Sequence, residues 1–342
     1  MAPGARSGGR ACLSEPRGRG VPRARGARSC PRGPRDRGQL GRRTRSLVAL
    51  GGALRSARHA SELDGGRPPR PRGVKPRITV VGSINLDLVA RCERLPRSGE
   101  TVSGGVFSRV PGGKGANQAV ACARLGADVT FVGATGRDAF AEEALVGLRE
   151  VRVTLELRAV DEPTGVALIL VDTSGENQIV VAPGANSTLG EIELPAHDAV
   201  LCQLEIPDEA VRSAWEGCTG FFCLNAAPAR PVAVDPDLTV VNRYEVEALS
   251  RRDGLVAVTL GAEGATLLED GEEIARARPP RVEAVDGTAA GDAFTACLLV
   301  SLLEKREPGE ALGRACAAGA LAASRLGAQP SLPTAAEIDS IL

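Results

Sequence analysis

The chain has 342 residues, 43% of them hydrophobic and 25% charged, which is enough material for one large α/β domain or two average domains. Its apolar runs stay below the roughly 18 residues that a membrane-spanning helix needs, so no such helix is expected. Aromatic residues make up only 2%, which argues against a surface that binds nucleic acid by stacking bases.

Charge divides the chain near residue 77. Residues 1–77 contain 19 Arg and one Lys against four acidic residues, whereas residues 78–342 contain 22 basic and 38 acidic residues. The two parts therefore carry net charges of +16 and −16, and the neutral average describes neither. The acidic surface of the second part argues against nucleic acid as its ligand.

Residues 1–76 are predicted to be a disordered extension, because a segment of Arg, Gly, Pro, Ser and Ala buries too little apolar surface to fold. Three interpretations stay open. The segment is dispensable, it is an Arg-rich targeting peptide, or it is an arm that binds phosphates of nucleic acid or of a membrane surface.

Nine cysteines and two histidines are present, and no two cysteines have CxxC spacing. A Cys/His metal site is therefore not expected. Cysteines inside apolar runs are typical of buried free thiols, which indicates a reducing compartment and a cytoplasmic protein.

From residue 77 onward, short apolar strands alternate with helices of 3.6-residue period. Buried or exposed strands are expected at 78–82, 88–95, 100–110, 129–136, 165–172, 177–186, 198–205, 221–225, 238–242 and 255–261, with a hairpin over 265–277. Helices are expected at 115–126, 138–150, 207–217, 290–305 and 310–327.

This alternation predicts an α/β fold with a mainly parallel sheet covered by helices on both faces. The antiparallel stretches near 87–110 and 165–181 predict a second, smaller sheet that projects from it. Residues 77–342 are thus expected to form the folded domain.

The segment Asp286-Gly-Thr-Ala-Ala-Gly-Asp292 precedes an apolar helix. Small residues there let successive N–H groups face an anion at the helix N-terminus. Asp292 would then stand where a base takes a hydroxyl proton during phosphoryl transfer. An Asp that caps an ordinary helix gives the same local pattern.

Other polar residues follow predicted strands, where ligands of open α/β sheets bind. The Gly-rich segment Pro111-Gly-Gly-Lys-Gly-Ala-Asn117 lacks the spacing of a P-loop but lets backbone approach a polar ligand. The remaining strand-end candidates are Asn85, Asp87, Glu205, Asn242 and Glu245. Each is also compatible with ordinary turn chemistry.

Six strings in one order resemble the PfkB carbohydrate kinases, and within that family the ribokinases: GSINLD, PGGKGAN, QLE, N-x-x-E, TLGAEG and D-x-T-A-A-G-D. The resemblance covers residues 78–342 and implies ATP-dependent phosphorylation of D-ribose at its 5-hydroxyl, which gives D-ribose 5-phosphate. Another sugar or nucleoside kinase of the family, and a sugar-binding or regulatory protein with weak catalysis, stay open as alternatives.

The resemblance implies that Asp292 is the catalytic base and that the N–H groups of Ala289, Ala290 and Gly291 form the anion hole. The residues that it implies for ribose binding are Asn85, Asp87, Gly113, Lys114, Asn117, Glu205 and Asp292.

For the nucleotide and the cations, the resemblance implies ATP with Mg²⁺, together with K⁺ as an activating monovalent cation. ATP would contact Asn242, Thr259, Gly261, Gly264 and Gly291, and Mg²⁺ would lie near Glu245. The positions implied for the monovalent cation are Asp286, Thr288, Ala322, Arg325, Gly327 and Ser331. The projecting sheet would be a lid and the surface of a homodimer.

Two segments, 207–225 and 242–259, are short for this family. We expect the sheet to lose helical cover there and to expose apolar surface.

Overall fold

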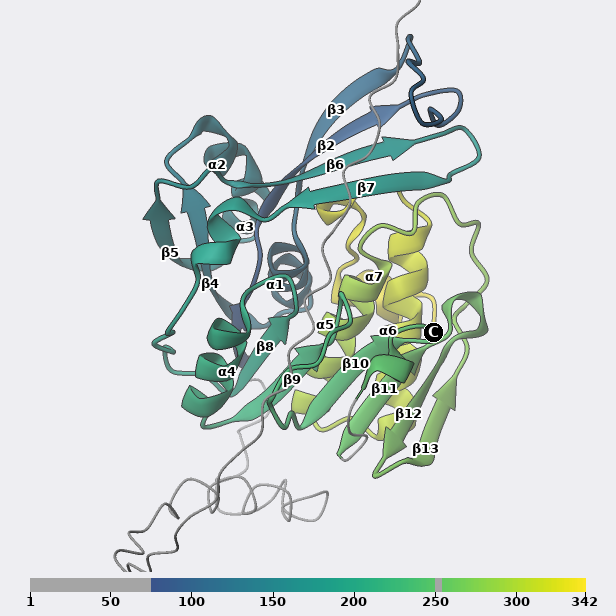
Figure 1. The fold of residues 1–342 in the computed structure, drawn as a ribbon. Coiled ribbons are helices and arrows are strands. Elements are labelled where there is room, and N and C mark those ends of the chain that lie inside the picture. The colour runs from purple at the N-terminus through teal and green to yellow at the C-terminus, as the bar shows by residue number, and fades with distance from the viewer. Residues whose placement is uncertain (1–74, 250–253) are drawn as a thin grey trace, which may run out of the picture. The chain divides into compact units, whose positions relative to one another are not determined.

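The computed structural model describes residues 75–249 and 254–342. Predictions about residues 1–74 and 250–253 concern parts of the chain outside this range. Within it, a nine-stranded sheet has the order β13-β12-β11-β10-β9-β8-β1-β4-β5 (Figure 1). Its strands are β1 (Arg77–Val81), β4 (Asp128–Gly136), β5 (Thr154–Val160), β8 (Ala199–Gln203), β9 (Phe221–Asn225), β10 (Leu238–Asn242), β11 (Leu255–Thr259), β12 (Ala265–Glu269) and β13 (Glu272–Ala277).

The large sheet is parallel from β5 to β11. β12 pairs antiparallel with both β11 and β13, and β12 and β13 form the predicted hairpin. The central strands β1 and β8 are short apolar runs whose residues are almost all buried, as expected of strands covered on both faces. β5 is not among the predicted strands, although its Leu155 and Leu157 alternate with charged residues in the pattern of an edge strand.

A second sheet of four strands has the order β3-β2-β6-β7 and lies across the top of the large sheet in Figure 1. Its strands are β2 (Asn85–Arg91), β3 (Val106–Gly112), β6 (Gly165–Val171) and β7 (Asn177–Ala182). Each predicted antiparallel pair is present, and a parallel contact between β2 and β6 joins them. We call this four-stranded sheet the lid.

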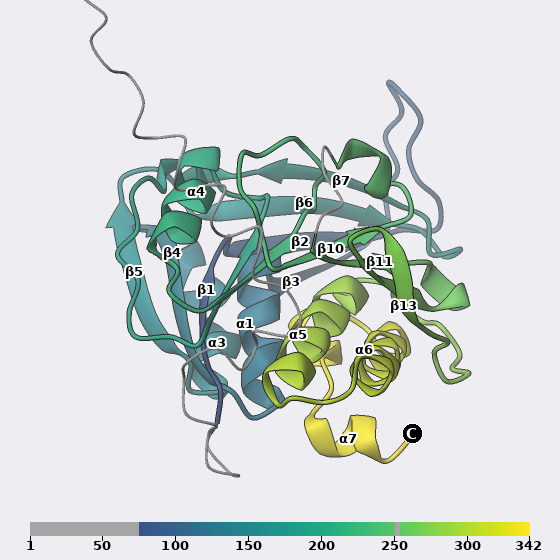
Figure 2. The same cartoon turned by 90° about the horizontal axis from the view of Figure 1, so that it is seen from below.

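Helices cover the large sheet on both faces, which confirms the predicted fold class. They are α1 (Lys114–Arg124), α2 (Ala139–Ala144), α3 (Val146–Glu150), α4 (Asp208–Gly217), α5 (Ala290–Leu303), α6 (Pro308–Ala323) and α7 (Ala335–Asp339). Figure 2 shows α1, α5 and α6 on one side and α4 on the other. The helix predicted over 138–150 is two helices that meet at Leu145. In the described part of the chain, every helix is too short or too polar to cross a bilayer.

The sheet separates two hydrophobic cores. Ile78 and Val80 of β1 belong to the core beneath α1, α5 and α6, whereas Val81 belongs to the core beneath α4. Helix α5 is apolar around its whole circumference because it packs between α1, α6 and the sheet. This burial fixes where the N-terminal end of α5 lies.

The expected loss of cover is smaller than predicted. On the α4 side, Val241 of β10 and Val256 of β11 are both 1% exposed. The loop after β9 supplies the cover, since Val232 and Val234 pack on this core and Trp215 of α4 donates its indole N–H to the Asp235 carbonyl at 2.9 Å. Val258 and Leu268, nearer the edge, are half-buried.

The close approach of α1 to the end of β1 can be tested at a glycine. A Cβ on Gly115 would lie 2.6 Å from Ser83 N and 2.7 Å from Gly82 Cα, so Gly115→Ala must push α1 away from backbone. We expect this variant to lower the free energy of unfolding by about 1–3 kcal/mol in guanidinium titrations. Gly313→Ala in α6 is the control. Its Cβ meets nothing within 4 Å, so stability should rise by roughly 0.5–1 kcal/mol. Equal stability of Gly115→Ala and the wild type would contradict the packing.

Candidate functional site

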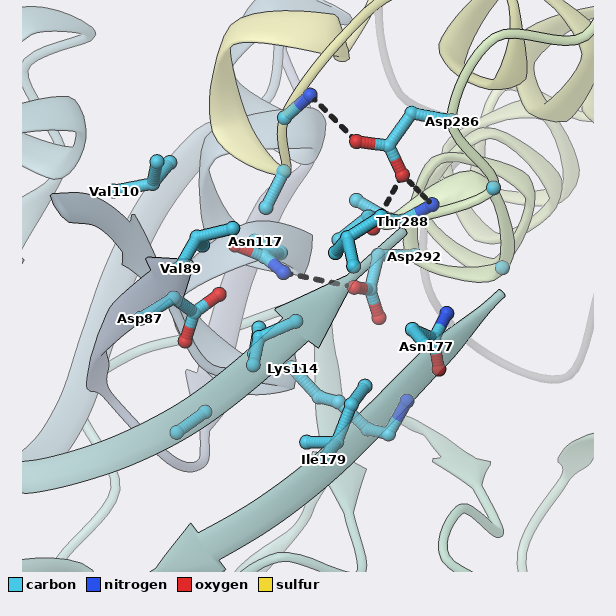
Figure 3. A pocket seen from close by; sticks show the side chains of 18 of the residues that line it. Asp87, Val89, Val110, Lys114, Asn117, Asn177, Ile179, Asp286, Thr288 and Asp292 are labelled. Carbon is cyan, nitrogen blue, oxygen red and sulfur yellow. Dashed lines mark hydrogen bonds between the residues drawn. The ribbon is translucent and has the colours of Figure 1, made fainter. Parts of the chain in front are cut away.

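A cavity of about 960 Å³ lies between the lid and the carboxyl ends of the parallel strands. The lid contributes an apolar inner wall, which includes Val89, Ile169 and Ile179. Polar side chains come from the other walls, and Figure 3 shows several of them pointing into the same space. Predicted site residues that line the cavity are Asn85, Asp87, Gly113, Lys114, Asn117, Glu205, Asn242, Glu245, Thr259, Asp286, Thr288, Ala289, Gly291, Asp292 and Gly327.

Asp292 lies in the first turn of α5 and is 5% exposed. Its Oδ2 accepts a hydrogen bond from Asn117 Nδ2 at 3.0 Å, drawn in Figure 3, and its Oδ1 accepts one from Gln118 Nε2 at 2.9 Å. Both donors belong to α1, so α1 and α5 meet at this carboxylate. The arrangement leaves a carboxylate at a helix N-terminus that faces the cavity, where it can accept a proton from a bound hydroxyl.

Acidic groups surround one lysine on the lid side of the cavity. Burial, reinforced by repulsion from Glu205 and Asp292, raises the pKa of Asp87 to about 7. Burial alone would lower the pKa of Lys114, but attraction to Asp292, Glu205 and Glu245 outweighs it and raises that pKa. The cavity thus offers hydrogen-bond acceptors around a single ammonium group.

The start of α1 is fixed by the loops that follow β1 and β8. Glu205 Oε2 accepts hydrogen bonds from Ser83 Oγ at 2.6 Å and from the Lys114 backbone N–H at 3.0 Å. Gly113 has a φ of 89°, and a Cβ there would lie 2.8 Å from Asn85 N. Only glycine fits this turn, which explains why the predicted Gly-rich segment can bring α1 so close.

The loop before α5 is held by Asp286. Its carboxylate accepts hydrogen bonds from Thr288 N at 2.9 Å, Thr288 Oγ1 at 2.5 Å and Gly327 N at 3.0 Å. Burial opposes ionisation, yet these hydrogen bonds lower the pKa of Asp286. Arg91 of the lid approaches the same carboxylate to 3.9 Å. At the helix start, Ala289 has a φ of 61°, a left-handed conformation that an alanine seldom adopts.

Several predicted residues lie outside the cavity wall. Ala290 is one, and its N–H donates to the Gly287 carbonyl at 3.3 Å. Arg325 pairs with Glu337 at 2.7 Å, and the Ser331 hydroxyl donates to the Ala328 carbonyl at 2.8 Å. The predicted positions that are absent from the wall are Ala290, Ala322, Arg325, Ser331, Gly261 and Gly264. Among the described residues, no group of three or more His, Cys, Asp or Glu side chains is arranged to hold a metal ion.

The far end of the cavity carries the predicted N-x-x-E pair. Glu245 Oε2 accepts a hydrogen bond from the Asn242 backbone N–H at 2.9 Å, and Asn242 Oδ1 accepts one from the Glu245 N–H at 2.9 Å. Asn242 is also the register partner of Thr259. Tyr244 is 82% exposed and does not line the cavity, so its ring leaves the space beside Glu245 open.

Polar residues that were not predicted also belong to this site, and four of them contact its central groups or line its wall. Ser83 and Gln118 bond predicted site residues, Asn225 lines the cavity at the end of β9, and Arg91 faces Asp286. A signal was present for Asn225, because polar residues at the carboxyl ends of parallel strands face the ligand crevice. The other three depend on contacts between segments far apart in sequence.

The raised pKa of Asp87 makes a prediction about stability. A folded-state pKa near 7 lies above the unfolded value near 3.8, so the wild type loses stability as pH rises from about 4 to 7. Asp87→Asn removes this loss. We expect the variant to be more stable than the wild type at pH 8, by on the order of 2–4 kcal/mol in urea unfolding, with a smaller difference at pH 5. Asp161→Asn, at a side chain 98% exposed, is the control. The same pH dependence in the wild type and Asp87→Asn would refute the burial of this charge.

Comparisons with known proteins show the family of this chain. The sequence profile described as "pfkB family carbohydrate kinase" matches residues 75–335. The ribokinase of Lactococcus lactis is 34% identical over 292 residues, which span 78% of this chain and 97% of that protein.

Solved structures resemble the fold over the same range. A Thermotoga maritima ribokinase superposes with a TM-score of 0.70 at 32% identity, covering 78% of this chain and 99% of the other. An Arabidopsis thaliana ribokinase, complexed with ribose and ATP, superposes with a TM-score of 0.67 at 29% identity, with the same coverage. The predicted resemblance is confirmed, and the chain belongs to the PfkB carbohydrate kinase family.

Proposed function

We propose that this protein is a ribokinase, which transfers the γ-phosphoryl group of ATP to the 5-hydroxyl of D-ribose. The observation that carries the proposal is the buried Asp292 carboxylate, held by Asn117 at 3.0 Å where the N-terminus of α5 meets a polar cavity. The ribokinases among its relatives, one of them complexed with ribose and ATP, support this substrate pair.

Ribose would bind between the lid and the start of α1. Its hydroxyl groups would donate hydrogen bonds to the carboxylates of Asp87 and Glu205, and Lys114 would donate to a ring or hydroxyl oxygen. Asn85, Gly113 and Asn117 complete the sugar side. A ligand rich in hydroxyl groups suits this cavity because it satisfies buried carboxylates that repel one another.

Asp292 would take the proton of the 5-hydroxyl while that oxygen attacks the γ-phosphorus and ADP leaves. Negative charge on the transferred group would be stabilised by N–H groups in the first turn of α5, at Ala289, Ala290 and Gly291. First-turn N–H groups have no partner within their own helix, which makes them available to an anion. The Ala290 N–H would exchange its bond to the Gly287 carbonyl for one to phosphate.

ATP would occupy the far end of the cavity, beside Asn242 and Thr259, with the turn at Gly261 and Gly264 next to the base. Mg²⁺ usually keeps several waters and binds through substrate phosphates and one or two carboxylates, so Glu245 alone suffices on the protein side. When bound, Mg²⁺ would neutralise phosphate charge.

A monovalent cation, K⁺, would bind at the loop that holds Asp286. The side-chain oxygens of Asp286 and Thr288 and the backbone oxygens at Ala322, Arg325, Gly327 and Ser331 are the hard donors that such an ion prefers. Burial opposes ionisation of Asp286, but its hydrogen bonds lower its pKa, which favours the charged form that a cation ligand needs. The seven described cysteines are free and six of them are buried, which supports a cytoplasmic, reducing location.

The mechanism is tested at Asp292. The wild type should release ADP only when D-ribose, ATP, Mg²⁺ and K⁺ are all present. Asp292→Asn preserves shape but removes the base, so we expect kcat to fall about 10³-fold with ribose affinity retained within about tenfold. Coupled ADP release and ribose calorimetry measure the two quantities. Turnover of the variant near the wild-type rate would exclude Asp292 as the base.

The outer face of the lid supports a homodimer. Phe107, Leu168 and Val180 are 62%, 51% and 65% exposed, and strand register places all three opposite the face that carries Asp87. Such an apolar sheet face suits a second copy of the same surface. We propose that two lids pack through it.

A charge on this face should separate the copies. We expect Leu168→Glu to shift the protein from dimer to monomer in sedimentation velocity, because the carboxylate would be buried without a partner. Ile274→Glu on β13, at a residue 41% exposed and away from the lid, should leave the dimer intact. A wild-type protein that stays monomeric at 100 µM would exclude the proposed dimer.

A further inference from the structure

We propose that Gln118 is a positioning residue for Asp292. Gln118, Gln203 and Asn225 form a buried network of side-chain amides that turns the NH₂ group of Gln118 toward the Asp292 carboxylate. This inference rests on the proposed function. Gln118 follows Asn117 on α1 but does not line the cavity and is 0% exposed. Its side chain contacts two residues that do line the cavity, Asp292 and Asn225.

The network runs from two strands of the large sheet through α1 to α5. Gln203 at the end of β8 donates its Nε2 to Gln118 Oε1 at 2.7 Å. Gln118 Nε2 donates to Asn225 Oδ1 at 2.9 Å and to Asp292 Oδ1 at 2.9 Å. Asn225, at the end of β9, donates its Nδ2 to the Val240 carbonyl of β10 at 3.1 Å. The chain of bonds thus ties the carboxylate to the sheet.

The order of donors in this network follows from one fixed acceptor. A backbone carbonyl can only accept, so the Val240 oxygen requires the NH₂ group of Asn225 to face it. Asn225 Oδ1 must then face Gln118, which turns the NH₂ group of Gln118 toward Asn225 and Asp292. Both hydrogens of that NH₂ group are used, one for each acceptor.

Gln203 sets the other end of Gln118. Gln203 donates to Gln118 Oε1 and so keeps this oxygen turned away from Asp292. If the Gln118 amide were reversed, Oε1 would face the Asp292 carboxylate and repel it. This orientation leaves Gln203 Oε1 buried without a hydrogen bond, beside Gly82, where a Cβ would lie 2.1 Å from it.

The consequence for Asp292 is a carboxylate with a fixed position. Asn117 holds Oδ2 and Gln118 holds Oδ1, so both oxygens are placed before substrate enters. A base that is already oriented can reach the proton of a bound hydroxyl group without first rotating.

The test replaces Gln118 by methionine, which keeps the length but removes all three hydrogen bonds of the side-chain amide. We expect Gln118→Met to lower kcat about 10- to 100-fold, with KM for ATP within about threefold of the wild type. Ribose affinity in calorimetry should also stay within about threefold, because Gln118 does not line the cavity. Gln329→Met is the matched control, because Gln329 is 3% exposed and its side-chain amide atoms have no hydrogen-bond partner. It should keep the wild-type kcat.

The outcomes separate this inference from the proposed function. A wild type that fails to phosphorylate D-ribose refutes the proposed function. An active wild type with Gln118→Met within twofold of its kcat, or with ribose affinity lowered as much as kcat, overturns the positioning role. Should Gln118→Met fail to fold, Gln203→Met decides, since it removes the hydrogen bond that Gln118 Oε1 accepts and so loosens the amide that holds Asp292. A loss of kcat with ribose affinity retained supports the network, and a wild-type kcat overturns it.

Discussion

Two helices begin at one point of the carboxyl edge of the sheet, and the contact between their first turns is the constraint on which the cavity depends. Asn117 and Gln118 of α1 hold both oxygens of Asp292 on α5. This contact is possible because α1 starts after a left-handed glycine and packs glycine against glycine on the end of β1. Helix α5 is apolar and buried against α1 and α6, and this packing holds Asp292 in place.

The cavity concentrates more negative than positive charge. Asp87, Glu205 and Asp292 gather around Lys114, and the cost of this arrangement appears as the pKa of Asp87, raised to about 7. Buried hydrogen-bond acceptors that lack donors lower the stability of the folded protein, so the cavity favours a ligand that supplies hydroxyl groups. The same polarity that lowers the stability of the free protein therefore serves the binding that we propose.

The two faces of the lid have different surroundings. Its inner face carries Asp87 and Val89 toward the cavity, and its outer face carries Phe107 and Leu168 toward solvent. Because side chains alternate along a strand, one register serves both faces, and a slip by one residue would exchange them. The parallel contact between β2 and β6 sets this register across segments about 80 residues apart.

Local sequence patterns predicted the family and most of the helices and strands, with β5 as an exception. Short apolar runs between amphipathic helices predicted the parallel sheet, and the order of GGKGAN, QLE and AAGD predicted a PfkB kinase, which the comparisons confirm. These signals are local, since period and glycine content depend on neighbouring residues. The roles predicted for Asp292 and the cation positions stay predictions.

How the polar residues of the buried amide network contact one another is visible only in the folded structure. Gln118, Gln203 and Asn225 each look like ordinary polar residues in the sequence, but the fold buries them in one network whose donors are ordered by the Val240 carbonyl. It also decided that a loop, not a helix, covers β10 on the α4 side. Hydrogen-bond direction and burial depend on contacts between different segments, such as Gln118 with Gln203 and Asp292, and the pattern of a single segment carries no information about them.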